Sequence, residues 1–213
     1  MLDDNSFVAN ALIVTGDGMS LAYKAGAPLM DMEMVQYHPT TLKGSGVLIT
    51  EGARGEGAYL LNKNGDRFLK QYAPNMMELA SRDVISRAAQ TEINEGRGVD
   101  GCVFLDCRHL DEKLIHERLS QIYEIAKDFA NVDITKSQIP IRPGMHYIMG
   151  GIKTDVNGRT IVPGLYAAGE TACVSVHGGN RLGANSLLDT IVFGRRAGEL
   201  AANTVMQHGH KPF

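Results

Sequence analysis

The sequence lacks the features that mark membrane-spanning, secreted and nucleic-acid-binding proteins. No apolar run approaches the roughly 18 residues that a membrane-spanning helix needs, and the N-terminus has no signal-peptide pattern. The 21 lysine and arginine residues are scattered and are outnumbered by 24 acidic residues, so no basic footprint for nucleic acid is present. We therefore expect neither nucleic-acid binding nor direct membrane insertion.

Cysteine is scarce. The three cysteines are odd in number and have no metal-like spacing; they are Cys102, Cys107 and Cys173. We expect reduced, mostly buried thiols in a reducing compartment, with neither disulfides nor a metal site.

What is present is the composition of a globular protein. Of the 213 residues, 44% are hydrophobic, which is enough for one large domain or two small ones. The 24 glycines occur without low-complexity segments. They therefore indicate tight turns and close backbone contacts rather than disorder.

One glycine-rich stretch, residues 177–189, looks like the focus of the chain. It leads into an apolar-patterned segment that predicts a helix to about Met206, with Asn185 and Ser186 placed to cap it. Free amides at such a helix start favour an anion or a carbonyl oxygen. An isolated turn of this kind is more often an ordinary loop and cap. The preceding segment, 164–170, predicts a short buried strand that ends in the carboxylate of Glu170.

Other polar side chains follow predicted strands. The alternating segment 30–37 predicts a strand that ends at His38, and the apolar run from Val47 predicts another that ends in Thr50 and Glu51. Polar groups at several strand ends indicate a shared site. A lone histidine is more often structural than catalytic, and Asp17 is most simply the cap of the following helix.

The remaining patterns suggest how the chain is organised. Residues 11–14 predict a buried strand, Asn64-Gly65 predicts a hairpin turn between 59–61 and 67–69, and 77–95 and 111–130 predict helices. The proline-rich segment 139–144 predicts a stiff hinge. We therefore expect an α+β unit over about 38–140, inserted between two pieces of another domain, 1–37 and 141–213.

Six ordered motifs carry a family resemblance. They are His38-Pro39-Thr40, residues 48–57, residues 79–83, residues 146–151, Ala168-Gly169-Glu170 and residues 177–187. In this order they resemble the flavoprotein subunit of succinate dehydrogenase and fumarate reductase, from Ala11 to about Leu200. L-aspartate oxidase belongs to the same superfamily, but residues 149–151 and 172–177 look more like the dicarboxylate reductases.

The resemblance implies a dicarboxylate site and an FAD site. Arg82 matches the arginine that moves the substrate proton, and Glu51 would relay that proton onward. The groups that grip the carboxylates of succinate or fumarate would be His38, Thr50, His146 and Arg181. Asp17, Glu170, Ser186 and Leu187 match FAD contacts, Glu170 on the polyol side and the Ser186-Leu187 pair at the isoalloxazine.

The resemblance also implies an α/β fold in which a substrate-capping domain, 38–140, lies between two pieces of an incomplete Rossmann-like FAD-binding domain. The family's strand–Gly-x-Gly-x-x-Gly–helix motif is absent from this sequence, so we expect a fragment that is inactive alone. Gly179 stands where the family more often has alanine.

The family further implies an iron–sulfur subunit and membrane anchor subunits as partners. The parent would be cytoplasmic, or peripheral on the cytoplasmic or matrix face of an energy-transducing membrane. Two alternatives stay open: an L-aspartate oxidase-like flavoenzyme, and a catalytically silent capping-domain module.

Overall fold

The computed structural model describes residues 9–11 and 13–208, and these fall into two compact units. Among the described residues, unit 1 holds 9–10 and 37–146, and unit 2 holds 11, 13–36 and 147–208. The chain passes between the units at 10/11, 36/37 and 146/147, and the expected inserted part, 38–140, lies within unit 1.

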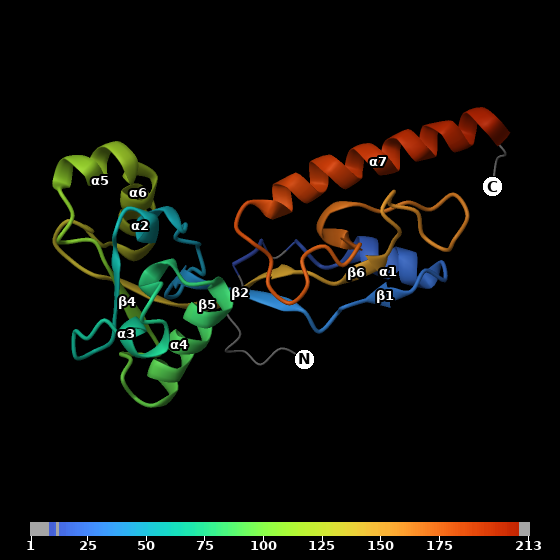
Figure 1. The fold of residues 1–213 in the computed structure, drawn as a ribbon. Helices are drawn as coiled ribbons and strands as arrows, with labels where there is room; N and C mark the ends of the chain where they lie inside the picture. Colours follow the sequence, from blue (N-terminus) through green and yellow to red (C-terminus); the bar gives the residue numbers. More distant parts are fainter. Residues whose placement is uncertain (1–8, 12, 209–213) are drawn as a thin grey trace. The chain divides into compact units, whose positions relative to one another are not determined.

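Unit 1 is built on the four-stranded sheet β2–β5–β4–β3 (Figure 1). Its strands are β2 (Val35–Leu42), β3 (Tyr59–Leu61), β4 (Val103–Asp106) and β5 (Ile139–Ile148). β4 pairs antiparallel with both β3 and β5. The helices of this unit are α2 (Gly52–Gly55), α3 (Leu69–Tyr72), η1 (Met77–Leu79), α4 (Arg82–Asn94), α5 (Glu112–Arg118) and α6 (Ser120–Ala130).

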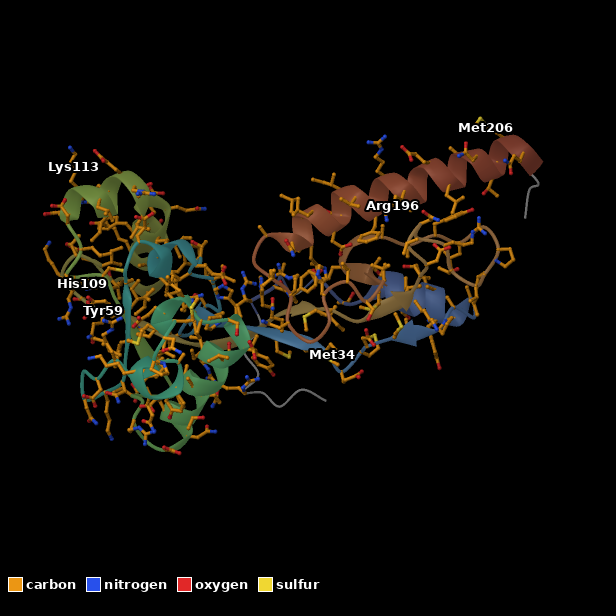
Figure 2. The ribbon with its side chains drawn as sticks, viewed as in Figure 1. Met34, Tyr59, His109, Lys113, Arg196 and Met206 are labelled. Carbon is orange, nitrogen blue, oxygen red and sulfur yellow. The ribbon has the colours of Figure 1, made fainter. Side chains whose placement is uncertain are left out.

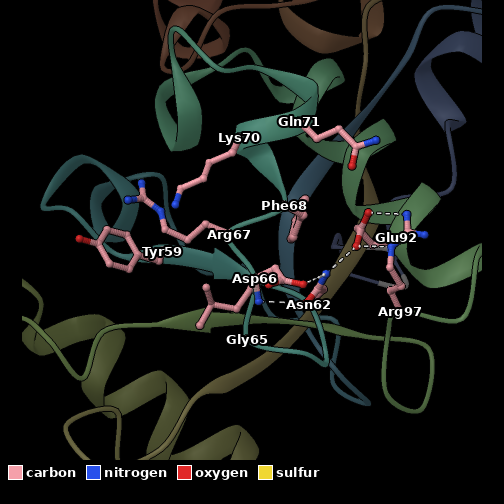
Figure 3. A pocket seen from close by; sticks show the side chains of 11 residues that line it. Tyr59, Asn62, Gly65, Asp66, Arg67, Phe68, Lys70, Gln71, Glu92 and Arg97 are labelled. Atoms are coloured by element: carbon pink, nitrogen blue, oxygen red, sulfur yellow. Dashed lines mark hydrogen bonds and ion pairs between the residues drawn. The ribbon is translucent and has the colours of Figure 1, made fainter.

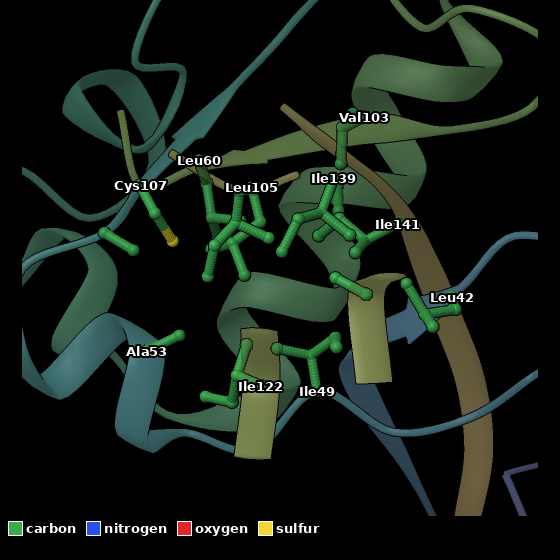
Figure 4. Packing of buried hydrophobic residues seen from close by; sticks show 14 of the residues in the cluster. Leu42, Ile49, Ala53, Leu60, Val103, Leu105, Cys107, Ile122, Ile139 and Ile141 are labelled. Atoms are coloured by element: carbon green, nitrogen blue, oxygen red, sulfur yellow. The ribbon is translucent and has the colours of Figure 1, made fainter. Parts of the chain in front are cut away.

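A single apolar core holds unit 1 together (Figure 4). Strand residues such as Leu60, Leu105 and Ile141 are fully buried in it. α4 contributes Ile85, Ala88 and Ala89, whose spacing puts them on one face of the helix. The core thereby fixes α4, and with it Arg82 at the first position of that helix.

Unit 2 contains the small sheet β1–β6–β7 and the long helix α7 (Figure 1). Its elements are α1 (Asp17–Lys24), β1 (Leu29–Met30), β6 (Gly151–Lys153), η2 (Gly169–Thr171), β7 (Ala172–Cys173) and α7 (Asn185–His208). β6 pairs antiparallel with β1 and parallel with β7. Within the described residues no helix, α7 included, is both long and apolar enough to cross a membrane.

Two glycines let the backbones of unit 2 approach closely. A Cβ atom on Gly150 would lie 2.2 Å from the carbonyl oxygen of Asp31, and one on Gly151 would lie 2.6 Å from that of Thr171. The Gly-Gly step is therefore required for β6 to pass between these two segments.

Several predicted elements are confirmed. α7 begins at Asn185 and runs through Met206, and β4 occupies the predicted strand at 102–106. The two predicted helices are present in two pieces each, η1 with α4 and α5 with α6. All three cysteines are free and buried, and burial raises the pKa of Cys107 to about 12.

Other predictions were wrong. Residues 47–51 form only an isolated bridge, and Thr50 and Glu51 precede the short helix α2 instead of ending a strand. The segment 139–144 is the first part of β5, because Pro140 lies in a strand that pairs through its neighbours. Residues 67–69 do not pair with β3, whose partner is β4.

Two further predicted strands are absent. Ile13 is 86% exposed and the described residues of 11–14 are irregular, so the part of this segment that the structure describes forms no buried strand. Residues 164–168 contribute only an isolated bridge, between Arg159 and Tyr166, and Glu170 lies in η2.

Candidate functional site

The sequence-predicted residues fall into two clusters, one in each unit. The cluster in unit 1 contains His38, Glu51, Arg82 and His146. The cluster in unit 2 contains Glu170, Arg181, Ser186 and Leu187. Each is described by itself.

The unit 1 cluster is centred on an ion pair between Arg82 and Glu51. Arg82 Nε donates to Glu51 Oε1 at 2.6 Å, and Nη2 of Arg54 lies 3.5 Å from the same oxygen. α2 places Arg54 one turn after Glu51, while the start of α4 places Arg82. Two arginines therefore face one carboxylate, which leaves the cluster positively charged and suited to an anion.

His38 lies beside this pair and is 1% exposed. Burial chiefly, and then the positive charge of Arg82, lower the pKa of His38 to about 2. The backbone N–H of Thr40 donates to His38 Nδ1 at 3.3 Å, so in the neutral ring Nε2 carries the hydrogen. Among the residues described, Nε2 has no hydrogen-bond partner. A buried N–H donor without a partner costs about 1–3 kcal/mol, and an anionic ligand would satisfy it.

The ring of His146 meets that of His38 edge to face, with centroids 5.3 Å apart. His146 is in β5 and His38 is in β2, so the pairing of these two strands brings the rings together. Thr50 is exposed just before α2. The sequence had not singled out Arg54, although its spacing of three residues from Glu51 in a helical turn was a usable signal.

The unit 2 cluster surrounds the ring of Tyr147. A hollow of about 210 Å³ is lined by Tyr147, Glu170, Ser186, Leu187 and Thr190. Glu170 Oε1 accepts the backbone N–H of Ile148 at 3.1 Å, and partial burial raises the pKa of Glu170. The hollow therefore brings together three of the four predicted cofactor contacts.

Asp17 is not among the residues that line the hollow. It is exposed in the first turn of α1, where it accepts a hydrogen bond from Thr15 Oγ1 at 2.8 Å. Gly16, rather than Asp17, occupies the N-cap. A Cβ on Gly18 would lie 2.8 Å from Thr171 Oγ1, so the start of α1 lies against η2, the element that carries Glu170.

A larger hollow, about 700 Å³, lies elsewhere in unit 1 (Figure 3). None of the predicted site residues lines it. Arg97 pairs with the buried Glu92, which Asn62 and Tyr72 also contact. Tyr59 also lines this hollow, and its ring stacks on that of His109 with centroids 3.8 Å apart (Figure 2). These paired charges make a stabilising network. Among the described residues that line the hollow, no buried side-chain donor lacks a hydrogen-bond partner.

A comparison with known families matches residues 4–187 to the FAD binding domain family, over most of the chain. The chain belongs to this family. The sequence is 52% identical over 215 residues to the fumarate reductase flavoprotein subunit of Mycobacterium tuberculosis, covering 95% of this chain and 37% of that protein. It is 54% identical over 212 residues to the succinate dehydrogenase flavoprotein subunit of Rickettsia bellii, covering 93% and 36%.

A structure of quinol fumarate reductase from Escherichia coli matches this chain with a TM-score of 0.92 and 48% sequence identity. The match covers 97% of this chain and 38% of the Escherichia coli chain. The predicted resemblance to flavoprotein subunits is therefore confirmed. The chain spans a little over a third of the length of these relatives.

The unit 2 hollow fits part of a flavin cofactor. Its carboxylate and hydroxyl suit hydroxyl groups and a carbonyl, while Tyr147 and the 65%-exposed Leu187 offer apolar surface to a ring. Gly169 lets η2 pack on α7, because a Cβ there would lie 2.8 Å from Thr190 Cγ2. A volume of about 210 Å³ is below the usual range for a whole ligand, so the hollow has room for only part of FAD.

Proposed function

We propose that this chain supplies the dicarboxylate-binding part and a portion of the FAD-binding part of a succinate dehydrogenase or fumarate reductase flavoprotein subunit. The observation that carries the proposal is the buried Nε2–H of His38, which has no partner among the described residues and lies in a cluster with two arginines. A dicarboxylate dianion matches both the charge and the donor. Unit 1 would be the substrate-capping domain, and the outer segments would belong to the FAD-binding domain.

The proposed roles are those that the family resemblance implies, and contacts within each unit support some of them. In unit 1, His38 donates from Nε2 to a substrate carboxylate, with His146 and Thr50 as further donors. In unit 2, taken by itself, Arg181 binds a carboxylate through its guanidinium. Arg82 delivers a proton to an alkene carbon of fumarate and regains one from Glu51, and in succinate oxidation the same path runs in reverse. The 2.6 Å contact between Arg82 and Glu51 supports this path.

When bound, FAD would supply the hydride acceptor or donor for the neighbouring carbon. Glu170, Ser186 and Leu187 would hold it, and Asp17 would contact it from α1. We further propose that the parent protein passes electrons to an iron–sulfur subunit and membrane anchor subunits, and that it lies peripherally at the membrane, on its cytoplasmic or matrix side. The relatives named as subunits of such enzymes support this proposal.

The test is binding of malonate, an unreactive dicarboxylate, to the purified chain by calorimetry, together with retention of yellow FAD absorbance after desalting. We expect malonate binding that Arg82→Ala weakens and Arg108→Ala, a matched arginine paired with Asp106, does not. Absence of malonate binding would contradict a dicarboxylate site in this chain. Loss of FAD on desalting would contradict a cofactor site made by these residues alone.

A further inference from the structure

The ring of Tyr147 lies at the centre of the unit 2 cluster and has a role that the proposed function does not assign. The guanidinium carbon of Arg181 lies 4.3 Å from the centroid of this ring. Tyr147 also lines the hollow that holds Glu170, Ser186 and Leu187. One buried aromatic ring, 5% exposed, therefore contacts the proposed carboxylate-binding arginine and bounds the proposed flavin hollow.

Buried polar groups hold this ring in place. Its hydroxyl donates to Asp189 Oδ2 over 3.5 Å, and His177 Nε2 lies 3.3 Å from the same oxygen. The rings of Tyr147 and His177 meet edge to face, with centroids 5.7 Å apart. Asp189 is 8% exposed in the second turn of α7, so α7 and the loop before it both anchor the ring.

Other contacts fix the backbone that carries Arg181. Gln36 Nε2 donates to the carbonyl oxygen of Arg181 at 2.7 Å and to Asn180 Oδ1 at 3.1 Å. Arg181 Nη1 donates to the Leu182 carbonyl oxygen at 3.1 Å. Gln36 therefore holds the backbone of Arg181, and the Leu182 carbonyl oxygen holds one nitrogen of its guanidinium. The face of the Tyr147 ring then sets the plane of the guanidinium.

We infer that Tyr147 is a positioning residue that orients the Arg181 guanidinium for a dicarboxylate, and that Asp189 and His177 fix its ring. This inference rests on the proposed function only for the identity of the ligand. An arginine fork binds a carboxylate through two parallel hydrogen bonds, so its plane decides how the carboxylate lies. Pre-orientation also removes the ordering cost that a free arginine side chain would add to binding.

The test follows the side-chain Nε–Hε NMR signal of Arg181 in the complete chain, assigned through Arg181→Lys, and the malonate dissociation constant. The ring current of Tyr147 is expected to shift the Arg181 signal upfield. Tyr147→Leu should abolish this shift and weaken malonate binding about tenfold, the loss of about 1.4 kcal/mol of pre-orientation. Tyr147→Phe keeps the ring but loses its bond to Asp189, so it should move the Arg181 signal in part and weaken malonate binding less than Tyr147→Leu does. Tyr166→Leu, a matched change in the same unit at a tyrosine bonded to Thr204, should leave both unchanged.

The two arms separate the inference from the proposed function. An upfield shift that is missing in the unmodified chain, or that persists in folded Tyr147→Leu, would overturn the positioning role whether or not malonate binds. A shift that Tyr147→Leu abolishes, in a chain that does not bind malonate, would support the positioning role and count against the ligand. If Tyr147→Leu does not fold, Asp189→Ala decides: a released ring must move the Arg181 signal, and an unmoved signal overturns the inference.

Discussion

Arg82 Nε and Glu51 Oε1 lie 2.6 Å apart, joined by a charge-assisted hydrogen bond between two helix starts that are 31 residues apart in the chain. Arg54 approaches the same carboxylate oxygen at 3.5 Å. The Arg82 side chain is 11% exposed, whereas the Glu51 side chain is 42% exposed. The contact thus connects a shielded arginine to a carboxylate that solvent reaches, which is the order a proton path requires.

Glu51→Gln should remove the carboxyl group that returns a proton to Arg82 while retaining an oxygen for the Arg82 N–H. In a flavoprotein subunit that contains this chain, we expect kcat for fumarate reduction to fall by about 100-fold or more, with little change in KM. The control is Glu56→Gln, which removes an ion pair with Arg118 outside the cluster and should leave turnover unchanged. Steady-state rates at several fumarate concentrations make the measurement. Unaltered turnover in Glu51→Gln would refute the relay.

His38 should remain neutral in the folded chain under conditions that protonate it in the unfolded chain. Its folded pKa is depressed from 6.5 to about 2, so the unfolded state binds the proton more readily. The contribution of the neutral His38 ring to the free energy of unfolding is fully present above pH 6.5 and is lost as the pH falls from 6.5 toward 2. Nitrogen NMR at neutral pH should find hydrogen on Nε2 and none on Nδ1. A His38 signal that titrates near pH 6.5 in the native state would disprove this, and the urea-unfolded chain supplies the reference titration.

Glu92→Gln should destabilise unit 1 in a pH-dependent way. Hydrogen bonds from Arg97 first, and from Asn62 and Tyr72, lower the pKa of Glu92 to about 2 although burial opposes them. We expect a loss of about 2 kcal/mol in the free energy of unfolding at neutral pH. Because the carboxylate pKa is lowered from 4.5, the difference from the unmodified chain should shrink as the pH falls from 4.5 toward 2.

Urea unfolding followed by circular dichroism measures this effect. Glu95→Gln is the matched control, since Glu95 pairs with the same Arg97 but its side chain is 54% exposed. It should change stability little. An equal loss in both variants, or a loss in Glu92→Gln that does not vary with pH, would contradict the role assigned to the buried pair.

Gly150→Ala should disrupt the strand crossing in unit 2. The added methyl group would meet the backbone of Asp31 at 2.2 Å, and backbone cannot move aside as a side chain end can. We expect a loss of about 3 kcal/mol or more in the free energy of unfolding. Gly198→Ala in α7 meets no atom within 4 Å and should be neutral or stabilising. Thermal unfolding of the Gly150→Ala and Gly198→Ala variants tests this prediction. Equal melting temperatures of the two variants would exclude the close approach of Gly150 to the Asp31 backbone.

Local patterns predicted those features that depend on neighbouring residues. The helical spacing of apolar residues in 187–206 predicts a helix, and α7 covers this segment. The motifs around His38 and Arg181 were enough to indicate the family. The patterns failed where pairing partners are distant. The local sequence around Pro140 predicts a hinge, yet the residues on either side of Pro140 pair with β4 in a sheet. The apolar run at 47–51 forms no strand, because its pairing is limited to the isolated bridge between Leu48 and Thr41.

The sequence by itself determined the family, the cofactor class and the identity of most residues proposed for the site. Only the tertiary structure decided their chemical state. His38 is neutral with hydrogen on Nε2 because folding buries it beside Arg82 and fixes Nδ1 on Thr40. Tyr147 meets Arg181 only because β5 and the loop before α7 converge. Desolvation and charge act through space, so residues far apart in the chain set properties that no sequence spacing encodes.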